Sequence, residues 1–425
     1  MLIPRVRRVS SRIRSLKRSM ALGATRLLIT SPLVKLNPRN FRSFEGLLSG
    51  RAAQRPVVVL TGARQTGKTS LVRRAFSSYE YVSLDLPSEA EQAEHDPTSF
   101  LARHQPPLIV DEVQYAPGLF RHLKAAVDRH RVKNGQYILM GSHKLGLMKA
   151  VSESLAGRAD ILELETLSWL EVRAAIPKVS VMEFLARGGF PELYEKPGLD
   201  AQAFQRSYVA TYLERDLRQL LQVSSLRDFE RFIRACALRS GQLLTRADLA
   251  RDVGISGPTA AAWLSVLQAS GQVMLLEPWF SNRTKSLVKS PKLYLGDTGL
   301  CCFLSGIRSL ADLQESPMAG ALWETLVFGE LRRLQLNNRG GWDLHFWRDR
   351  NKEVDFLFHR GGVFELADAK WTGLPTQKDA LVLQHVANEI GKVKRAALIC
   401  RAANAYPITK LVQALPLESL PEEWA

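Results

Sequence analysis

Short apolar runs and stretches with helical spacing follow one another along the first part of the chain. Residues 57–60 (VVVL), 106–114 (PPLIVDEVQ) and 136–142 (QYILMGS) contain apolar runs of the length of a strand. The first run leads directly into residues 71–76 (LVRRAF), which have a helical pattern. Buried strands that alternate with helices are typical of α/β domains. The pattern therefore predicts the α/β fold class here.

The middle of the chain has the periodicity of helices. Apolar and aromatic residues recur at helical spacing in residues 207–221 (SYVATYLERDLRQLL), which indicates a helical lid or connector. Residues 243–278 predict a helix–turn–helix followed by strands, in which Gly254 ends the first helix and Ser256 caps the second. Gly271 would end that second helix. This is the winged-helix pattern.

The C-terminal part predicts the order helix, strand, strand, helix. Residues 320–334 form the first helix of this pattern, and residues 353–370 (EVDFLFHRGGVFELADAK) resemble a hairpin with HRGG as its turn. Asp355, Asp368 and Lys370 stand where such a hairpin usually carries apolar or β-branched residues. These charges are either solvated edge residues or parts of a site.

The N-terminus differs from the rest of the chain in its charge. Residues 1–44 contain eleven Lys and Arg residues and no Asp or Glu. Removing these eleven from the 58 basic residues leaves 47 against 42 acidic ones, a net charge of +5 instead of +16. Apolar residues at spacings of three and four in residues 1–20 predict an amphipathic helix. It is a membrane-surface helix, a nucleic-acid arm or a transit-type segment; otherwise it is an unstructured tail, or Met20 is the true first residue.

Composition restricts the class of protein. Of the 425 residues, 46% are hydrophobic and 24% are charged, as in soluble globular proteins. No run of 18 apolar residues occurs, so we expect no membrane span. The four cysteines form no CxxC pair and no histidine stands at metal-ligand spacing with them. We therefore expect a reducing, cytoplasmic location and no structural zinc site.

Residues 57–70 (VVVLTGARQTGKTS) carry the most specific motif of the chain. An apolar strand runs into Gly62-x-x-x-x-Gly67-Lys68-Thr69, which is the P-loop pattern between a strand and a helix. The glycines allow backbone N–H groups to surround phosphates at a helix N-terminus, Lys68 reaches the phosphates, and the Thr69 hydroxyl binds Mg²⁺. We therefore predict that ATP and Mg²⁺ bind to this loop. The predicted binding residues are Gly62, Ala63, Arg64, Gln65, Thr66, Gly67, Lys68, Thr69 and Ser70.

Two carboxylates follow the next buried strand. Asp111 and Glu112 stand at the end of PPLIVDEVQ. In an ATPase, Asp111 would lie beside Mg²⁺, and Glu112 would act as the general base that polarises the attacking water. The alternative is that the pair only marks a helix start after a strand.

Several segments resemble the AAA-type ATPase module of a family of bacterial and archaeal ATPases with a conserved-hypothetical C-terminal domain. They are TGARQTGKTS, LIVDEVQYAP, LMGSHKL and SLAGRADILEL, and the resemblance covers roughly residues 40–420. It implies that Ser142 is a polar sensor of the γ-phosphate, although AAA proteins commonly carry Asn there. It also implies that Arg158 acts as a phosphate-sensing or trans-acting arginine, which would require a homo-oligomer such as a ring. The alternative for Arg158 is a helix-end arginine paired with an acid.

The winged-helix pattern raises the question of DNA binding. Its second helix, residues 258–270 (PTAAAWLSVLQAS), contains no Lys, Arg, Asn or His, so we do not expect sequence-specific recognition. The predicted wing, residues 279–292, is different, because it carries four basic residues together with Trp279 and Phe280. Such a strip would grip phosphate backbones without reading the sequence, or it is a solvated hairpin. The basic residues of the predicted wing are Arg283, Lys285, Lys289 and Lys292.

The C-terminal order of elements resembles the PD-(D/E)XK fold of restriction and repair nucleases. The matching residues are Glu324, Asp355, Asp368 and Lys370. The resemblance implies that the carboxylates converge on Mg²⁺ while the lysine orients or activates water for attack on a phosphodiester. The family usually carries Glu where this chain has Asp368. A surface ion pair would have the same spacing, and some members of the fold retain the scaffold without cutting.

The chain is thus predicted to contain a P-loop AAA-type ATPase domain, a winged-helix domain and a restriction-endonuclease-like α/β domain. The predicted boundaries are 1–44 for the tail, 45–175 for the ATPase core, 176–225 for the helical connector, 226–315 for the winged helix and 316–425 for the nuclease-like domain. Two functions are possible, and the basic residues of the predicted wing and the C-terminal carboxylates favour the first of them. Either ATP hydrolysis drives DNA binding, translocation or remodelling, or the protein is a nucleotide-controlled switch whose later domains bind protein partners without nuclease activity.

Overall fold

The computed structural model describes most of the chain beyond the basic tail. The described residues are 38–142, 144–196, 198–213, 226–280, 290–338, 341–349, 351–420 and 424. The predicted amphipathic helix of residues 1–20 lies outside them, as do Arg283, Lys285 and Lys289 of the predicted wing.

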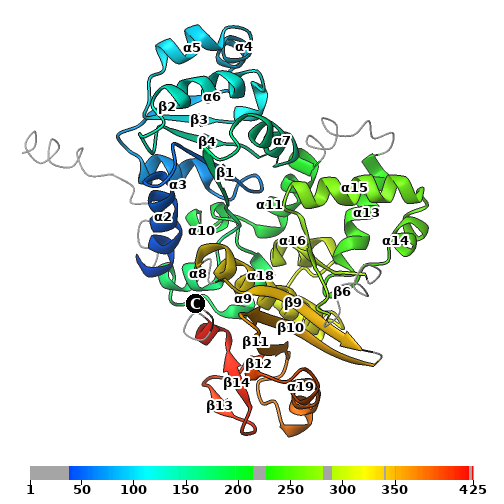
Figure 1. Ribbon diagram of the computed structural model, residues 1–425. Coiled ribbons are helices and arrows are strands. Elements are labelled where there is room, and N and C mark those ends of the chain that lie inside the picture. Colours follow the sequence, from blue (N-terminus) through cyan, green and yellow to red (C-terminus); the bar gives the residue numbers. More distant parts are fainter. Residues whose placement is uncertain are drawn as a thin grey trace, which may run out of the picture.

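The first part is built on a five-stranded parallel sheet (Figure 1). Its order is β2-β3-β4-β1-β5, so that β1 lies between β4 and β5. The strands are β1 (Val57–Thr61), β2 (Glu80–Ser83), β3 (Leu108–Asp111), β4 (Tyr137–Met140) and β5 (Ala159–Glu163). This parallel sheet confirms the predicted α/β fold class.

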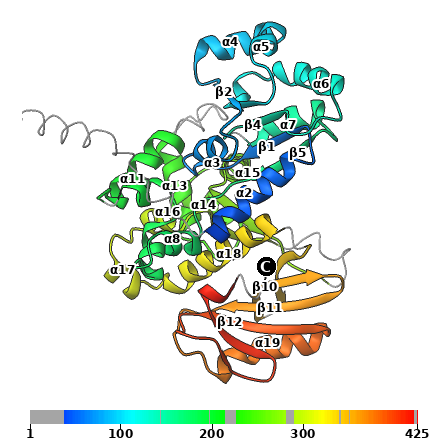
Figure 2. The same cartoon turned by 90° about the vertical axis from the view of Figure 1, so that its left-hand side faces the viewer.

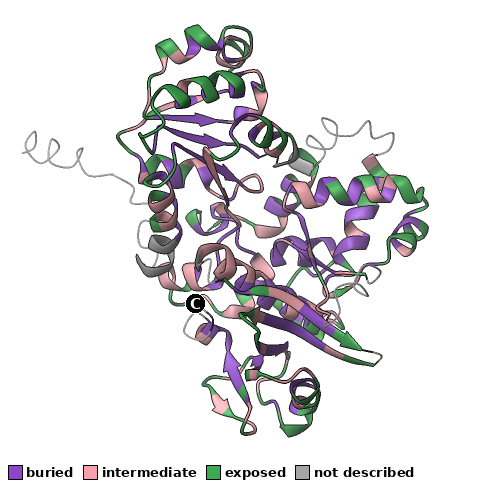
Figure 3. Ribbon diagram, in the orientation of Figure 1, coloured by how far each residue is buried: buried purple, intermediate pink, exposed green. Residues whose placement is uncertain are grey.

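Helices cover both faces of this sheet, and the central strands are buried (Figure 3). Val58 and Leu60 of β1 pack with Phe44 of α2 on one face, whereas Val57 and Val59 pack with the opposite layer. Alternate side chains of a strand point to opposite faces, which explains why the run is continuously apolar. The helices are α2 (Pro38–Ala52), α3 (Lys68–Ala75), α4 (Pro87–His95), α5 (Pro97–Arg103), α6 (Leu119–Arg129) and α7 (Lys144–Ser154).

The middle part is mainly helical and includes a small antiparallel sheet of order β6-β8-β7. Gly254 ends α14 with φ of 80°, and Ser256 caps α15 by accepting a hydrogen bond from Thr259 N at 3.1 Å, as predicted. The first elements are α8 (Trp169–Ala175), α9 (Val181–Arg187), α10 (Glu192–Glu195), α11 (Ala201–Tyr208) and a π-helical turn (Val209–Leu213). They are followed by α13 (Leu226–Ala237), β6 (Gln242–Leu243), α14 (Arg246–Val253), α15 (Gly257–Ala269), β7 (Val273–Leu276), β8 (Lys292–Leu295), α16 (Thr298–Leu304) and α17 (Leu310–Glu315).

The C-terminal part is a six-stranded mixed sheet of order β13-β14-β12-β11-β10-β9. Helix α18 packs on one face and α19 on the other. The predicted order helix, strand, strand, helix is present, with a further strand, β9, before the predicted hairpin. The elements are α18 (Ala319–Asn338), β9 (Asp343–Asp349), β10 (Lys352–Arg360), β11 (Val363–Ala369), α19 (Gln377–Ile390), β12 (Val393–Cys400), β13 (Tyr406–Pro407) and β14 (Val412–Pro416).

Helix α18 joins the parts of the molecule. One hydrophobic cluster extends from the middle helices through α18 to one face of the C-terminal sheet. The same helix also contacts α2 of the first part, and Figure 2 shows it between the two large sheets. The middle and C-terminal parts therefore share a core. No helix among the described residues is long and apolar enough to cross a membrane.

Candidate nucleotide site and carboxylate cluster

The P-loop connects β1 to α3 at the carboxyl end of the parallel sheet. Gly62 has φ of 148°, and a Cβ at this position would lie 2.1 Å from the carbonyl oxygen of Leu164, so only glycine fits. Gly67 precedes α3 with φ of 89°, in the left-handed region. The backbone conformation of the loop therefore explains why the motif has glycine at both positions. They allow the loop to bring its N–H groups to the start of a helix, where anions bind.

Lys68 is held against the loop that it follows. Its Nζ donates to the carbonyl oxygens of Gly62, at 3.0 Å, and of Ala63, at 2.8 Å. The Thr66 hydroxyl also donates to Ala63 O, at 3.0 Å. The ammonium group thus lies within the predicted phosphate cradle, as the motif requires.

Thr69 and Asp111 meet although 42 positions separate them in the chain. The Thr69 hydroxyl donates to Asp111 Oδ2 at 2.8 Å, and the Tyr81 hydroxyl donates to the same oxygen at 2.9 Å. Burial and the adjacent Asp111 raise the pKa of Tyr81 to about 12, so Tyr81 remains a neutral donor. Oxygen ligands of this kind suit Mg²⁺, and the two predicted Mg²⁺ residues fit the ion.

Glu112 is held by two polar side chains. Its Oε2 accepts hydrogen bonds from Ser142 Oγ, at 3.2 Å, and from Gln114 Nε2. The backbone of Glu112 has φ of 53°, a left-handed conformation that is uncommon outside glycine and often marks functional sites. Ser142, predicted to sense the γ-phosphate, therefore contacts the predicted general base.

Arg158 lies at the other end of the sheet. It immediately precedes β5, whose first residue Ala159 pairs with Val57 at the beginning of β1, whereas the P-loop follows the end of β1. Its guanidinium group makes two hydrogen bonds to the carboxylate of Asp128, at 2.7 and 2.9 Å. Arg158 thus cannot sense the phosphate of its own chain, and the predicted pairing with an acid is observed. A role in trans remains a proposal.

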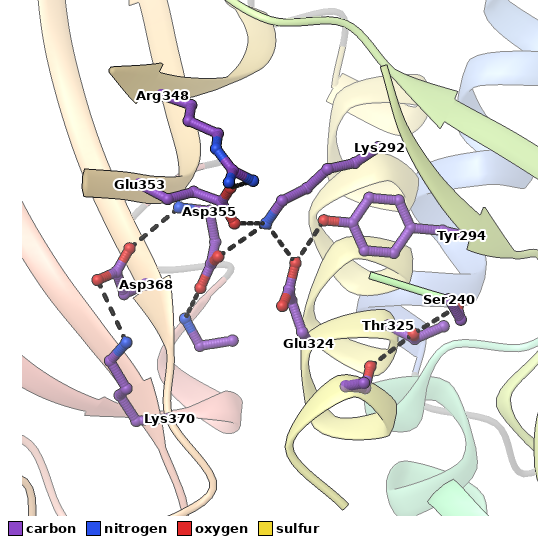
Figure 4. Close-up of polar contacts among 12 residues, drawn as sticks. Ser240, Lys292, Tyr294, Glu324, Thr325, Arg348, Glu353, Asp355, Asp368 and Lys370 are labelled. Carbon is purple, nitrogen blue, oxygen red and sulfur yellow. Dashed lines mark hydrogen bonds and ion pairs between the residues drawn. The ribbon is translucent and has the colours of Figure 1, made fainter. Parts of the chain in front are cut away.

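A separate cluster of charged side chains surrounds Lys292, whose side chain is only 1% exposed (Figure 4). Its Nζ lies 2.8 Å from Glu324 Oε1, 2.9 Å from Asp355 Oδ1 and 2.6 Å from Glu353 Oε1. The Tyr294 hydroxyl also donates to Glu324 Oε1, at 2.6 Å. Burial alone would lower the pKa of Lys292, but the surrounding acidic groups outweigh burial and hold it above the ordinary lysine value.

Asp368 and Lys370 lie beside this cluster. Asp368 Oδ1 accepts a hydrogen bond from the backbone N–H of Asp355 at 3.0 Å, and Asp355 Oδ2 accepts one from Ala369 N at 3.0 Å. Lys370 Nζ lies 3.4 Å from Asp368 Oδ2. Burial raises the pKa of both Glu324 and Asp368. The structure therefore brings all four predicted nuclease-type residues together.

This arrangement does not fit the predicted metal site. The Lys292 ammonium group stands between Glu324 and Asp355, where a divalent ion would have to take its oxygen ligands. In the part of the chain that the structure describes, no three His, Cys, Asp or Glu side chains are arranged to hold a metal ion. We therefore derive no Mg²⁺-dependent step for Glu324, Asp355, Asp368 and Lys370.

The position of Lys292 also corrects the interpretation of the wing. Lys292 was expected in a strip that grips phosphates, but it is buried and paired with acids. Trp279 of the same strip packs edge-on against Phe364 of the C-terminal sheet, with ring centroids 5.1 Å apart. The ends of the predicted wing are therefore anchored within the protein.

Two curated relatives cover most of this chain. "Uncharacterized protein Rv2008c" of Mycobacterium tuberculosis and "Uncharacterized protein Mb2031c" of Mycobacterium bovis are each 32% identical to it over 372 residues. This region is 86% of the chain and 81% of each relative. The chain belongs to the family of these two proteins.

Family models match the three parts in succession. A model described as an AAA domain matches residues 54–173, and the first part is accordingly a P-loop AAA-type domain. Two models described as domains of unknown function, DUF8612 and DUF4143, match residues 179–311 and 319–420. Among solved structures, the Walker-type ATPase PABY2304 of Pyrococcus abyssi is similar with a TM-score of 0.43 and 16% identity, over 63% of this chain and 95% of that one.

Sequence reasoning missed those neighbours of the two candidate sites that come from distant segments. Lys292 joins the cluster from β8, and Leu336 and Asn337 of α18 line a cavity beside the P-loop. A signal for Lys292 was present, since β8 is an otherwise apolar strand that begins with a lysine. No local pattern indicated the position of α18, because its packing depends on the whole fold.

Proposed function

We propose that the chain is a Mg²⁺-dependent ATPase whose nucleotide state controls its middle and C-terminal parts. The observation that carries this proposal is the 2.8 Å hydrogen bond between Thr69 and Asp111. It joins the first turn of α3 to the end of β3, the two positions from which a P-loop ATPase holds Mg²⁺. The match of residues 54–173 to an AAA domain supports the same conclusion.

The residues of the site have complementary roles. When bound, Mg²⁺ supplies positive charge that stabilises the charge developing on the phosphoryl oxygens. Thr69 and Asp111 would hold the ion, and the Lys68 ammonium group would bind the phosphates. Glu112 would accept a proton from the attacking water, with Ser142 and Gln114 orienting its carboxylate.

Arg158 is proposed to act on the nucleotide of a neighbouring copy of the chain. Its distance from its own P-loop and its position at the edge of the sheet support a role in trans. In that case the guanidinium group would exchange Asp128 for phosphate oxygens in the assembled oligomer.

Hydrolysis measurements test the ATPase proposal. Wild-type protein should hydrolyse ATP with Mg²⁺, Lys68→Ala should lose ATP binding, and Glu112→Gln should bind ATP but turn it over about 100-fold more slowly. A wild-type protein that fails to bind ATP would refute the proposal. Normal turnover by Glu112→Gln would refute only the role of Glu112.

Between the two predicted uses of ATP, we favour the switch that binds protein partners. DNA binding by the middle part lacks support, because α15 carries no basic residue and Lys292 is buried instead of facing a phosphate backbone. The C-terminal part is proposed to be a nuclease-like scaffold that does not cut. Stimulation of ATP turnover by single-stranded, duplex or branched DNA would favour DNA translocation or remodelling instead.

A further inference from the structure

A cavity of roughly 270 Å³ begins at the P-loop and continues away from it toward the C-terminal part. Thr66, Gly67 and Ser70 line its P-loop end. Since the phosphates of a bound nucleotide lie at the start of α3, the remainder of the nucleotide would extend into adjoining space. We propose that this cavity binds the nucleoside part of the nucleotide and that α18 supplies one of its walls.

The chemistry of the walls suits an uncharged, partly apolar group. The apolar lining residues are Phe44, Leu71, Leu164, Leu167, Pro191 and Leu336. Among the charged lining residues, four are glutamates and two are arginines, so the cavity disfavours a second anionic group. A base would contact the apolar side chains, whereas its amino group or the ribose hydroxyls would find acceptors. The phosphates would remain at the P-loop.

Glu165 supplies an acceptor of this kind. Its side chain lines the cavity and is 6% exposed. One carboxylate oxygen accepts a hydrogen bond from Arg332 Nε, but Oε2 accepts none from the residues that the structure describes. Arg333 Nε lies 3.9 Å from Oε2, beyond hydrogen-bond distance. The Arg333 guanidinium group therefore compensates the charge of this oxygen only in part, and a shift of the buried Glu165 side chain toward the cavity would let a hydroxyl or amino group of the nucleoside donate to it.

Helix α18 is fixed to this site by several polar contacts. Arg333 donates to the carbonyl oxygen and to the hydroxyl of Thr166, at 2.9 Å each, and Arg332 also pairs with Glu163 at 3.2 Å. Glu330 accepts a hydrogen bond from Trp169 N at 2.9 Å. The residues that α18 contacts in this way belong to the segment around the end of β5. Leu164 of the same segment lies directly against Gly62 of the P-loop. These contacts therefore hold α18 in a fixed position as one wall of the cavity.

The consequence is that the C-terminal part contacts the nucleotide directly. Leu336 and Asn337, at the end of α18, line the cavity, while Glu324 on the same helix belongs to the Lys292 cluster. Glu324 and Arg333 are nine positions apart, about 13 Å along a helix. Nucleotide binding would then stabilise the docking of α18 on the AAA-type domain. This inference rests on the proposed ATPase function.

Calorimetric titration with ATP and with inorganic tripolyphosphate, both with Mg²⁺, tests the inference, because only ATP has a nucleoside. Leu336→Trp, which fills the cavity, should weaken ATP binding at least about tenfold and leave tripolyphosphate binding unchanged. Leu336→Ala should weaken ATP binding less, which covers the case in which the tryptophan prevents folding. The matched control is Leu381→Trp at an exposed position of α19, which should change neither affinity.

The outcomes separate the two proposals. Unchanged ATP binding by both Leu336 variants would overturn the inference, as would an equal loss of ATP and tripolyphosphate binding, while the ATPase proposal would stand. Failure of the wild type to bind either compound would overturn both. Hydrogen exchange gives a second measurement: amides of residues 330–337 should be protected by ATP but not by tripolyphosphate.

Discussion

Replacement of Lys292 by methionine tests the interpretation of the carboxylate cluster. The ammonium group lies within 2.9 Å of oxygens of Glu324, Glu353 and Asp355, and its removal leaves three carboxylates around one buried point. Breaking a buried charge pair costs about 3–5 kcal/mol. We expect the free energy of unfolding to fall by this amount and no more, because Glu353 is 29% exposed and water can partly solvate it.

The assay is urea unfolding at pH 7.5 without nucleotide or divalent ions. Lys196→Met is the control, since Lys196 is exposed and pairs with Glu192 on the surface, where a pair contributes about 0.5 kcal/mol or less. Millimolar Mg²⁺ should restore part of the stability of Lys292→Met but should not affect the wild type without nucleotide. A loss below about 1 kcal/mol, or an equal effect of Mg²⁺ on the wild type, would refute the reasoning.

Three further predictions concern single residues. Burial raises the pKa of Glu330 to about 7, so between the ordinary carboxyl pKa and pH 7 the folded state keeps a proton that the unfolded state has lost. Its contribution to the free energy of unfolding therefore falls as the pH rises through this window, and Glu330→Gln should be more stable relative to wild type at pH 7.5 than at pH 5. Asp297→Ala removes acceptors for Gly189 N and Leu300 N and should cost about 1–3 kcal/mol in the same unfolding assay, with Asp349→Ala, at an exposed position of β9, near zero. Arg158→Ala should lower ATP turnover about 1,000-fold without weakening nucleotide binding, and weaker binding would argue against action in trans.

The parts of the fold that depend on local sequence could be predicted. The P-loop combines an apolar strand, two glycines in unusual backbone conformations and a helix start, all within residues 57–70. Asp111 could be placed because the carboxyl ends of parallel strands lie at one edge of a sheet. The caps of α14 and α15 follow from single residues for the same local reason.

The parts that depend on distant contacts could not be predicted. Lys292 reaches Asp355 across 63 positions, and in sequence it looked like one of several wing lysines. Arg158 was recognised by its motif, but only the register of β5 against β1 shows at which end of the sheet it lies. The role of α18 at the cavity depends on how three parts of the chain pack together.

The continuity of α18 has a consequence for genetics. A twenty-residue helix is a rod of about 30 Å, and its two halves are held by different partners. A substitution that shifts the rod at Glu324 would also displace Leu336, and the reverse would hold. We therefore expect suppressor mutations to arise at the opposite end of the helix from the original defect. The residues that they change would make no contact with the residue that was first substituted.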